Sequence, residues 1–297
     1  MASAQARRNS TSTSSSGQTS SETSTQQWSN LEAQMTARQW LKLGSTGTAV
    51  SELQTMLGLA PSGQFDEATH QAVVAFQQRY RLDADGVVGP STFRTMAGVA
   101  SAGTANAILF EHETTGASAT TARQDKLNSG GVGASEQMAE NDQDRVLRYS
   151  GVFLQVGGEL DLPPALLMAI ASRETRGGSQ LKSDGYSMWD AQGYGLMQVD
   201  KNSHTPQGGP GSYEHVKQAG EILKDMLRMI EDKFPDWTPS QQLQGAVAAY
   251  NKGASRVRSL SNVDHITTGG DYSSDVWARA RYFATQLGQS LETEAQS

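Results

Sequence analysis

One glutamate stands where a carboxyl group can hold a proton. An apolar helix is predicted over residues 163–173, and Glu174 follows at its end, directly after Arg173. A pair of glycines comes shortly afterwards and favours a helix stop. Burial raises the pKa of a carboxyl group, whereas a neighbouring arginine lowers it. Glu174 is therefore a candidate general acid if its apolar neighbours dominate, and otherwise an ordinary carboxylate at a helix end.

Further polar side chains follow this glutamate along the chain. Asp190 and Asp200 bound a stretch of alternating side chains with two glycines, which indicates a short hairpin. An apolar helix is predicted downstream, and it ends in Tyr250 and Asn251. Two acids at one site can divide glycoside cleavage, because one protonates the leaving oxygen while the other activates water. The alternative for both aspartates is a structural role in turns.

The elements that must position these residues fall into two blocks. Half of residues 1–30 are Ser or Thr, which predicts disorder because such a segment buries little apolar surface. A compact block with three short predicted helices follows, and then a larger, mainly helical block. The composition divides the chain into a disordered tail at 1–38, the compact block at 39–98, a linker at 99–107, the larger block at 108–290 and a tail at 291–297.

Composition excludes several classes of protein. With no cysteine and no HxxxH pair among five histidines, we expect no metal site and no other cofactor. A net charge of −7 argues against nucleic-acid binding. No run of about 20 apolar residues predicts membrane insertion. No apolar run follows Arg7 and Arg8, so we expect synthesis in the cytoplasm without a signal peptide.

Three segments of the compact block carry a shared pattern: LxxGSxGxxVxxLQxxLG at 41–58, GxFDxxTxxAVxxFQ at 63–77 and DGVVGPxT at 85–92. With these segments the block resembles the three-helix peptidoglycan-binding domain family. The resemblance implies a three-helix bundle that binds the bacterial cell wall, and the alternative is a spacer without a ligand.

Before this block, Trp28, Leu31 and Met35 share one helical face, which predicts a short helix packed on the block or a docking handle for a partner.

The larger block contains several specific segments, which include SRE at 172–174, GYGLMQVDKxSHxPQG at 193–208, AAYNxG at 248–253 and ITTGxDYxxDVxARAxYF at 266–283. With these segments the block resembles the goose-type lysozymes from about residue 108 to 288. The resemblance implies an α+β lysozyme-like domain with a small β-hairpin, so the whole chain is expected to be mainly α. It also implies an N-acetylmuramidase, a glycoside hydrolase that cuts the β-1,4 bond between N-acetylmuramic acid and N-acetylglucosamine.

The same resemblance implies a role for each residue at a matching position. Glu174 is the general acid, and Asp200 and Asp190 position the water in an inverting reaction. The spacing of residues 179–190 departs from the animal members by about one residue, which makes Asp184 an alternative to Asp190. The side chains implied to line the sugar subsites are Gln198, His204, Tyr250, Asn251 and Tyr272.

Structural alternatives exist for the aromatic and histidine side chains. Tyr250 and Tyr272 are either subsite residues or half-buried core aromatics, and His204 either touches sugar or braces its loop. Trp189, beside the predicted acids, is either a core residue or a platform on which a sugar ring stacks. Trp277 is expected in the core.

The same sequence features also fit other activities, and they fit more than one biological setting. A lytic transglycosylase needs one catalytic acid and no positioned water, and a non-catalytic cell-wall-binding or virion component needs neither. We expect a monomer whose partner is peptidoglycan and which acts in the cell wall or periplasm. It fits a phage endolysin with holin-dependent release, and equally an antibacterial effector carried by secretion machinery and opposed by an immunity protein.

Overall fold

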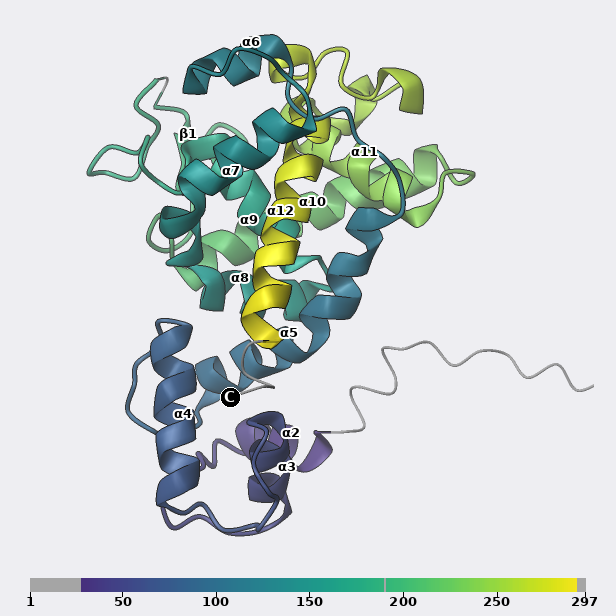
Figure 1. Ribbon diagram of the computed structural model, residues 1–297. Helices are drawn as coiled ribbons and strands as arrows, with labels where there is room; N and C mark the ends of the chain where they lie inside the picture. Colours follow the sequence, from purple (N-terminus) through teal and green to yellow (C-terminus); the bar gives the residue numbers. More distant parts are fainter. Residues whose placement is uncertain (1–27, 190, 293–297) are drawn as a thin grey trace, which may run out of the picture.

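The computed structural model describes residues 28–189 and 191–292. These residues form a small lower block and a larger upper block, which one long helix joins (Figure 1). The described part is mostly helical and contains one two-stranded antiparallel sheet, which confirms the mainly α fold. None of its helices is both long and apolar enough to cross a membrane. Most of the predicted N-terminal tail, residues 1–27, lies outside the described residues.

The lower block is built on a small apolar core. Its helices are α2 (Ser29–Thr36), α3 (Thr48–Met56), α4 (Glu67–Arg79) and the start of α5 (Pro90–Ala107). Leu31 and Met35 of α2 are buried in the same cluster as Val50 and Val73, so α2 packs on the block as one of the two alternatives predicted. Asp66 caps α4 by accepting a hydrogen bond from the Thr69 amide at 2.9 Å.

The segment at 99–107, which the sequence predicted as a linker, is helical. It is the C-terminal half of α5, which runs unbroken from the lower block into the upper one (Figure 1). Ala102 and Asn106 are buried, and Asn106 Oδ1 accepts a hydrogen bond from the Ala165 amide at 3.3 Å. The small residues that suggested a linker instead let this helix approach its neighbours closely.

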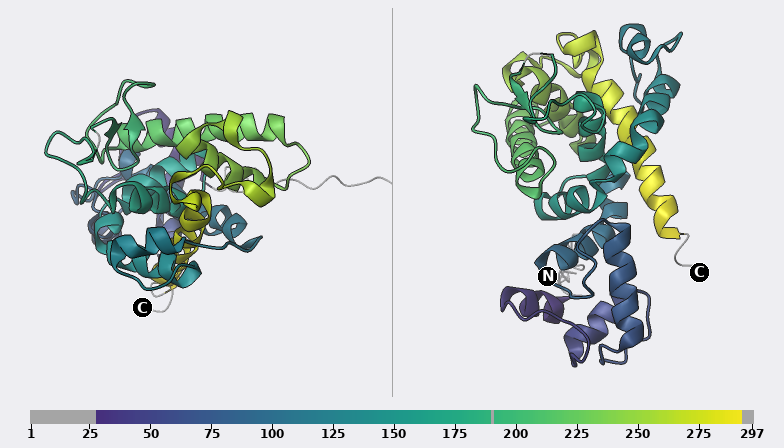
Figure 2. Two further views of the ribbon diagram at one scale, coloured as in Figure 1. Left: turned by 90° about the horizontal axis from the view of Figure 1, so that it is seen from above. Right: turned by 90° about the vertical axis from the view of Figure 1, so that its left-hand side faces the viewer.

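In the upper block, the other elements surround one central helix, α9 (Pro164–Thr175). Every residue from Leu162 to Ser172 is buried, so this helix is apolar on all sides. Figure 2 shows the surrounding elements from two further directions. They are η1 (Ile108–Phe110), α6 (Ala119–Ala122), η2 (Arg123–Asp125), α7 (Val132–Leu147), α8 (Ser150–Leu160), α10 (Tyr213–Lys233), α11 (Pro239–Lys252), η3 (Ala254–Arg256), η4 (Leu260–Asn262), η5 (Thr268–Gly270) and α12 (Tyr272–Glu292).

A hairpin lies beside the end of α9. Its strands β1 (Gly193–Tyr194) and β2 (Val199–Asp200) pair so that Gly193 faces Asp200. Thr175 Oγ1 donates a hydrogen bond to the Leu196 carbonyl at 2.9 Å, which ties the hairpin turn to the last residue of α9. The predicted hairpin is therefore present, although its strands are only two residues long.

Close backbone contacts join the two blocks. A Cβ atom on Gly98 of α5 would lie 2.1 Å from the Leu154 carbonyl oxygen of α8. A Cβ atom on Gly151 would lie 2.6 Å from the Tyr80 carbonyl oxygen. Both positions therefore need glycine for reasons of space, and α5 and α8 pack with almost no gap.

This packing predicts opposite effects for two glycines of α5. Gly98→Ala should lower the free energy of unfolding by about 1–3 kcal/mol, because the methyl group overlaps the Leu154 carbonyl. Gly103→Ala is the matched control, since no atom lies within 4 Å of its Cβ position. It should be stabilising by about 0.5–1 kcal/mol through helix propensity. Urea unfolding measures both, and equal effects of the two changes would contradict the packing.

Candidate active site

Glu174 lies in the last turn of α9 and is partly buried. Its Oε1 accepts a hydrogen bond from the hydroxyl group of Tyr272, the first residue of α12. Tyr272 is 1% exposed. Burial raises the pKa of Tyr272 well above its ordinary value, and the negative charge of Glu174 raises it further. Tyr272 therefore keeps its proton and acts as a permanent donor to the glutamate.

Tyr250 approaches the same carboxylate from α11. Its hydroxyl donates a hydrogen bond to the Met197 carbonyl in the hairpin turn at 2.8 Å. Burial raises the pKa of Tyr250, and the charge of Glu174 adds to this effect. The structure thus brings Glu174, Tyr250 and Tyr272 together from three helices, as the sequence predicted for these residues.

The Arg173 side chain forms ion pairs with two aspartates that lie far away in the chain. Its Nη1 lies 2.6 Å from Asp275 Oδ2, and its Nη2 lies 3.0 Å from Asp271 Oδ1. The same Nη2 donates a hydrogen bond to the Thr268 carbonyl at 2.9 Å. The arginine side chain is 7% exposed, so these contacts form a buried clamp between the end of α9 and the start of α12.

Asp275 joins this clamp to a second arginine. Burial alone would raise the pKa of Asp275, but Arg279 and Arg173 hold it below its ordinary value. Arg279 Nη1 also donates a hydrogen bond to Ser172 Oγ at 2.8 Å, and Ser172 Oγ donates to Asp142 Oδ2 at 2.8 Å. Both residues that precede Glu174 in the chain are therefore fixed by buried polar contacts.

The sequence analysis did not find this network. The i, i+4 spacing of Asp275 and Arg279 on one helix was the available signal, together with a serine at the end of an otherwise apolar helix. The partners of Arg173 lie about a hundred residues away in the chain, at Asp271 and Asp275, and local spacing does not show such contacts.

Gln198 occupies the hairpin turn. Its φ is +55°, an uncommon conformation for a residue other than glycine. Its Nε2 donates a hydrogen bond to the Gly195 carbonyl at 2.9 Å, so the side chain folds over its own turn. The structure therefore gives Gln198 a local structural contact beside the site.

Asp200 is exposed at the end of β2 and caps the turn that follows. Its Oδ1 accepts hydrogen bonds from the amide and the side chain of Asn202, both at 2.9 Å. Its carbonyl accepts from the amide of His204 at 2.9 Å, and the His204 side chain is exposed. These contacts match the turn role that was the alternative for Asp200. Asp190, the other predicted acid, lies outside the described residues.

Asp184, the alternative to Asp190, also lies in a turn. Its Oδ1 accepts a hydrogen bond from the Tyr186 amide at 3.0 Å. Trp189 follows in the same loop and is 78% exposed, which contradicts a core position for this side chain. Trp277, in contrast, is completely buried, and its Nε1 donates to the Leu109 carbonyl at 3.0 Å.

Asn251 supports the segment that the arginine clamp holds. Its Oδ1 accepts hydrogen bonds from the Thr268 amide at 2.9 Å and the Thr268 hydroxyl at 3.2 Å. Arg173 binds the carbonyl of the same threonine. Thr268 is therefore held from both sides, and its segment leads directly into Tyr272.

A buried histidine that the sequence analysis missed supports the hairpin. His215 is 0% exposed, and its Nε2 accepts a hydrogen bond from the Met197 amide at 3.2 Å. Burial lowers the pKa of His215 to about 4, so the ring is neutral at physiological pH. A Cβ atom on Gly195 would lie 2.4 Å from this ring, which explains the glycine at that turn position.

Comparisons with known proteins identify relatives of both blocks. The sequence model of the family described as Lysozyme g matches residues 109–287, and that of a peptidoglycan binding domain matches residues 46–96. A protein named lysozyme g from Cyprinus carpio is 48% identical over 176 residues, which cover 59% of this chain and 93% of that protein. Another from Epinephelus coioides is 48% identical over 189 residues, 61% of this chain and 97% of that protein. A third from Casuarius casuarius is 46% identical over 171 residues, 58% and 91% respectively.

The buried histidine predicts a pH dependence of stability. Its pKa is about 4 in the folded protein, whereas the ordinary value of about 6.5 applies in the unfolded chain, so the unfolded chain binds the proton first as the pH falls. The free energy of unfolding should therefore fall by about 3 kcal/mol on acidification from neutrality to pH 4, and the histidine adds little further loss below that pH.

His215→Gln is the control, because glutamine retains an acceptor for the Met197 amide without titrating. Chemical denaturation at a series of pH values measures the difference between the two proteins. The same dependence in both would show that His215 is not its source.

Proposed function

This chain belongs to the lysozyme g family of glycoside hydrolases, and from that membership we propose that it hydrolyses the glycan strands of bacterial peptidoglycan. The observation that carries the proposal is Glu174 at the end of a buried helix, hydrogen-bonded by Tyr272 within the matched segment. The bond cut is the β-1,4 linkage between N-acetylmuramic acid and N-acetylglucosamine.

Glu174 is the proton donor of this reaction. It protonates the glycosidic oxygen as the bond to the anomeric carbon breaks, which leaves the glutamate as a carboxylate. The Tyr272 hydroxyl already points at Oε1, and its raised pKa keeps it a donor. Its hydrogen bond strengthens as the negative charge develops, so it stabilises the transition state more than the ground state.

Asp200 positions the water, with Asp190 as its helper. A single displacement requires roughly 6.5–9.5 Å between acid and base carboxyls to admit that water, and it inverts the anomeric carbon. The bonds from Asn202 hold the Asp200 carboxylate in one orientation at the end of β2. That strand belongs to the hairpin that Thr175 ties to α9, the helix that carries Glu174.

The sugar subsites are proposed from the resemblance to the goose-type lysozymes. We assign them to Gln198, His204, Tyr250, Asn251 and Tyr272. Trp189, 78% exposed in the loop before β1, offers an indole face on which a sugar ring can stack.

The lower block binds the insoluble cell wall and so keeps the catalytic block close to its substrate. The domain division at 39–98 and 108–290 assigns wall binding to the first part and catalysis to the second. The protein then works as a monomer at the cell wall or in the periplasm. The setting is a phage endolysin with holin-dependent release or an injected effector that an immunity protein opposes.

Two carboxylate variants test the mechanism. Glu174→Gln should lower the rate of sacculus hydrolysis by about 10³-fold or more, because glutamine has no proton to give. Asp200→Asn should lower it by about 10²-fold, because the water loses its base. Glu113→Gln is the control, since that side chain is 95% exposed and should leave the rate unchanged. Turbidity of a sacculus suspension measures all three.

Pelleting with sacculi should remain unchanged in each variant, because the lower block is intact. Mass spectrometry of the products identifies the reaction, since hydrolysed ends retain a water and transglycosylase products carry a 1,6-anhydro ring. Full lysis by the Glu174→Gln variant would show that Glu174 is not the general acid. Products with a 1,6-anhydro ring would show that the protein is a lytic transglycosylase and not a hydrolase.

A further inference from the structure

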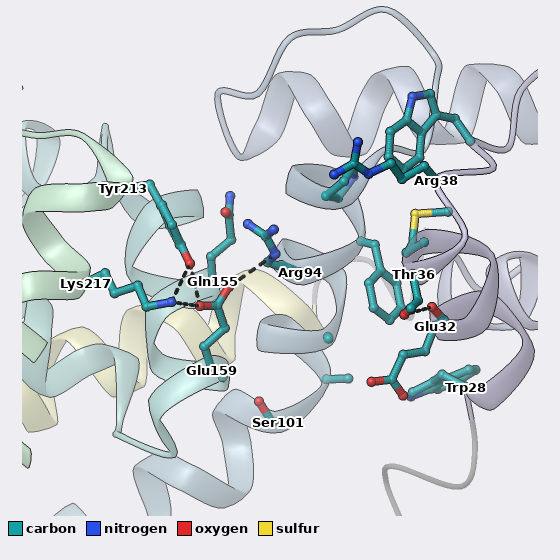
Figure 3. A pocket seen from close by; sticks show the side chains of 17 residues that line it. Trp28, Glu32, Thr36, Arg38, Arg94, Ser101, Gln155, Glu159, Tyr213 and Lys217 are labelled. Carbon is teal, nitrogen blue, oxygen red and sulfur yellow. Dashed lines mark hydrogen bonds and ion pairs between the residues drawn. The ribbon is translucent and has the colours of Figure 1, made fainter. Parts of the chain in front are cut away.

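A groove of about 840 Å³ lies where the two blocks meet (Figure 3). One wall comes from α2 and the residues after it as far as Trp40, and the other from α5, α8 and α10. None of the residues assigned to catalysis or to the sugar subsites lines it. The groove is therefore a second concave surface, separate from the candidate active site.

Aromatic side chains line both walls of this groove. Trp28 and Trp40 belong to the first wall, and Phe93 and Tyr213 belong to the second. Trp40 is 41% exposed, so part of its ring is accessible from the groove. Flat aromatic faces with a few polar groups around them suit the apolar face of a sugar ring.

The charged side chains of the groove are largely paired with one another. Glu159 Oε2 accepts a hydrogen bond from the Tyr213 hydroxyl at 2.5 Å and another from Lys217 Nζ at 3.2 Å. Arg94 Nε lies 3.3 Å from the other oxygen of the same carboxylate. Figure 3 shows these three side chains converging on Glu159. Glu159 thus offsets one of the two positive charges of this wall, and the polar groups around it can donate and accept hydrogen bonds with the hydroxyl and amide groups of a sugar chain.

The second wall of the groove is held together by contacts between α5 and α8. Gln155 Nε2 of α8 donates hydrogen bonds to Ser91 Oγ at 3.0 Å and Thr95 Oγ1 at 2.9 Å of α5. Gly158 of α8 also packs closely on Gly98 of α5. These contacts fix α5 relative to α8, so binding requires little ordering of the wall.

We propose that this groove binds a glycan strand of peptidoglycan as an uncharged chain of N-acetylhexosamine units. The identity of the polymer rests on the proposed function, whereas the site itself rests on the aromatic walls and the paired charges. A strand held here anchors the enzyme to the wall through both blocks at once, at a distance from the cut bond.

Fluorine NMR tests the proposal through the tryptophans. The chain has five, at 28, 40, 189, 237 and 277, and 5-fluorotryptophan gives each its own resonance. The full chain carrying Glu174→Gln is titrated with chitohexaose, a neutral chain of six N-acetylglucosamine units. The Trp28 and Trp40 resonances should shift and saturate, whereas the completely buried Trp277 should not move.

A pair of exposed apolar side chains provides the matched variants. Trp40→Ala should weaken the titration followed at Trp28 by about tenfold, as expected for removal of a central aromatic contact. Leu43→Ala changes a side chain of the same block that is 53% exposed and does not line the groove. It should leave the titration unchanged.

Three results would overturn the proposal. The first is the absence of a saturable shift at both Trp28 and Trp40. The second is a shift caused by a free peptidoglycan stem tetrapeptide and not by chitohexaose, which would identify a peptide site. The third is a response that requires deletion of residues 1–27, which would show that this segment of the chain occupies the groove. Because no hydrolysis is measured, each result is independent of the role of Glu174.

Discussion

The buried clamp around Arg173 is the contact on which the geometry of the site depends. Arg173 directly precedes Glu174, and its partner Asp271 directly precedes Tyr272. One ion pair therefore sets the position of Glu174 relative to the Tyr272 hydroxyl group that donates a hydrogen bond to it. Because both charges are buried, loss of one partner costs about 3–5 kcal/mol, and the fold cannot relax this contact at little cost.

The residues of the candidate site lie on two kinds of element, the ends of packed helices and an exposed turn. Glu174, Tyr250 and Tyr272 come from the ends of α9, α11 and α12, while Asp200 lies on an exposed turn. The hydroxyl of Tyr250 and the side chain of Thr175 bind the hairpin turn at Met197 and Leu196. The hairpin is thus attached to the helices at its turn.

The sequence predicted the parts of the site that depend on local pattern. The apolar run before Glu174 indicated the buried helix, and the glycine-rich stretch before Asp200 indicated the hairpin. Contacts between distant segments were not predictable in this way, and these include the Arg173 clamp and the His215 support. The helical conformation of the predicted linker at 99–107 was not predictable either, because small residues favour close helix packing as well as flexibility. The position of Trp189 was decided only by the structure.

The turnover number of Arg173→Lys tests the central claim most directly. Lysine retains the positive charge but cannot contact Asp271, Asp275 and the Thr268 carbonyl at once, because it lacks the planar fork of a guanidinium. If the clamp positions Glu174, kcat on sacculi should fall by about 10–100-fold in a protein whose circular dichroism is unchanged. An unchanged kcat in a folded Arg173→Lys protein would contradict the account.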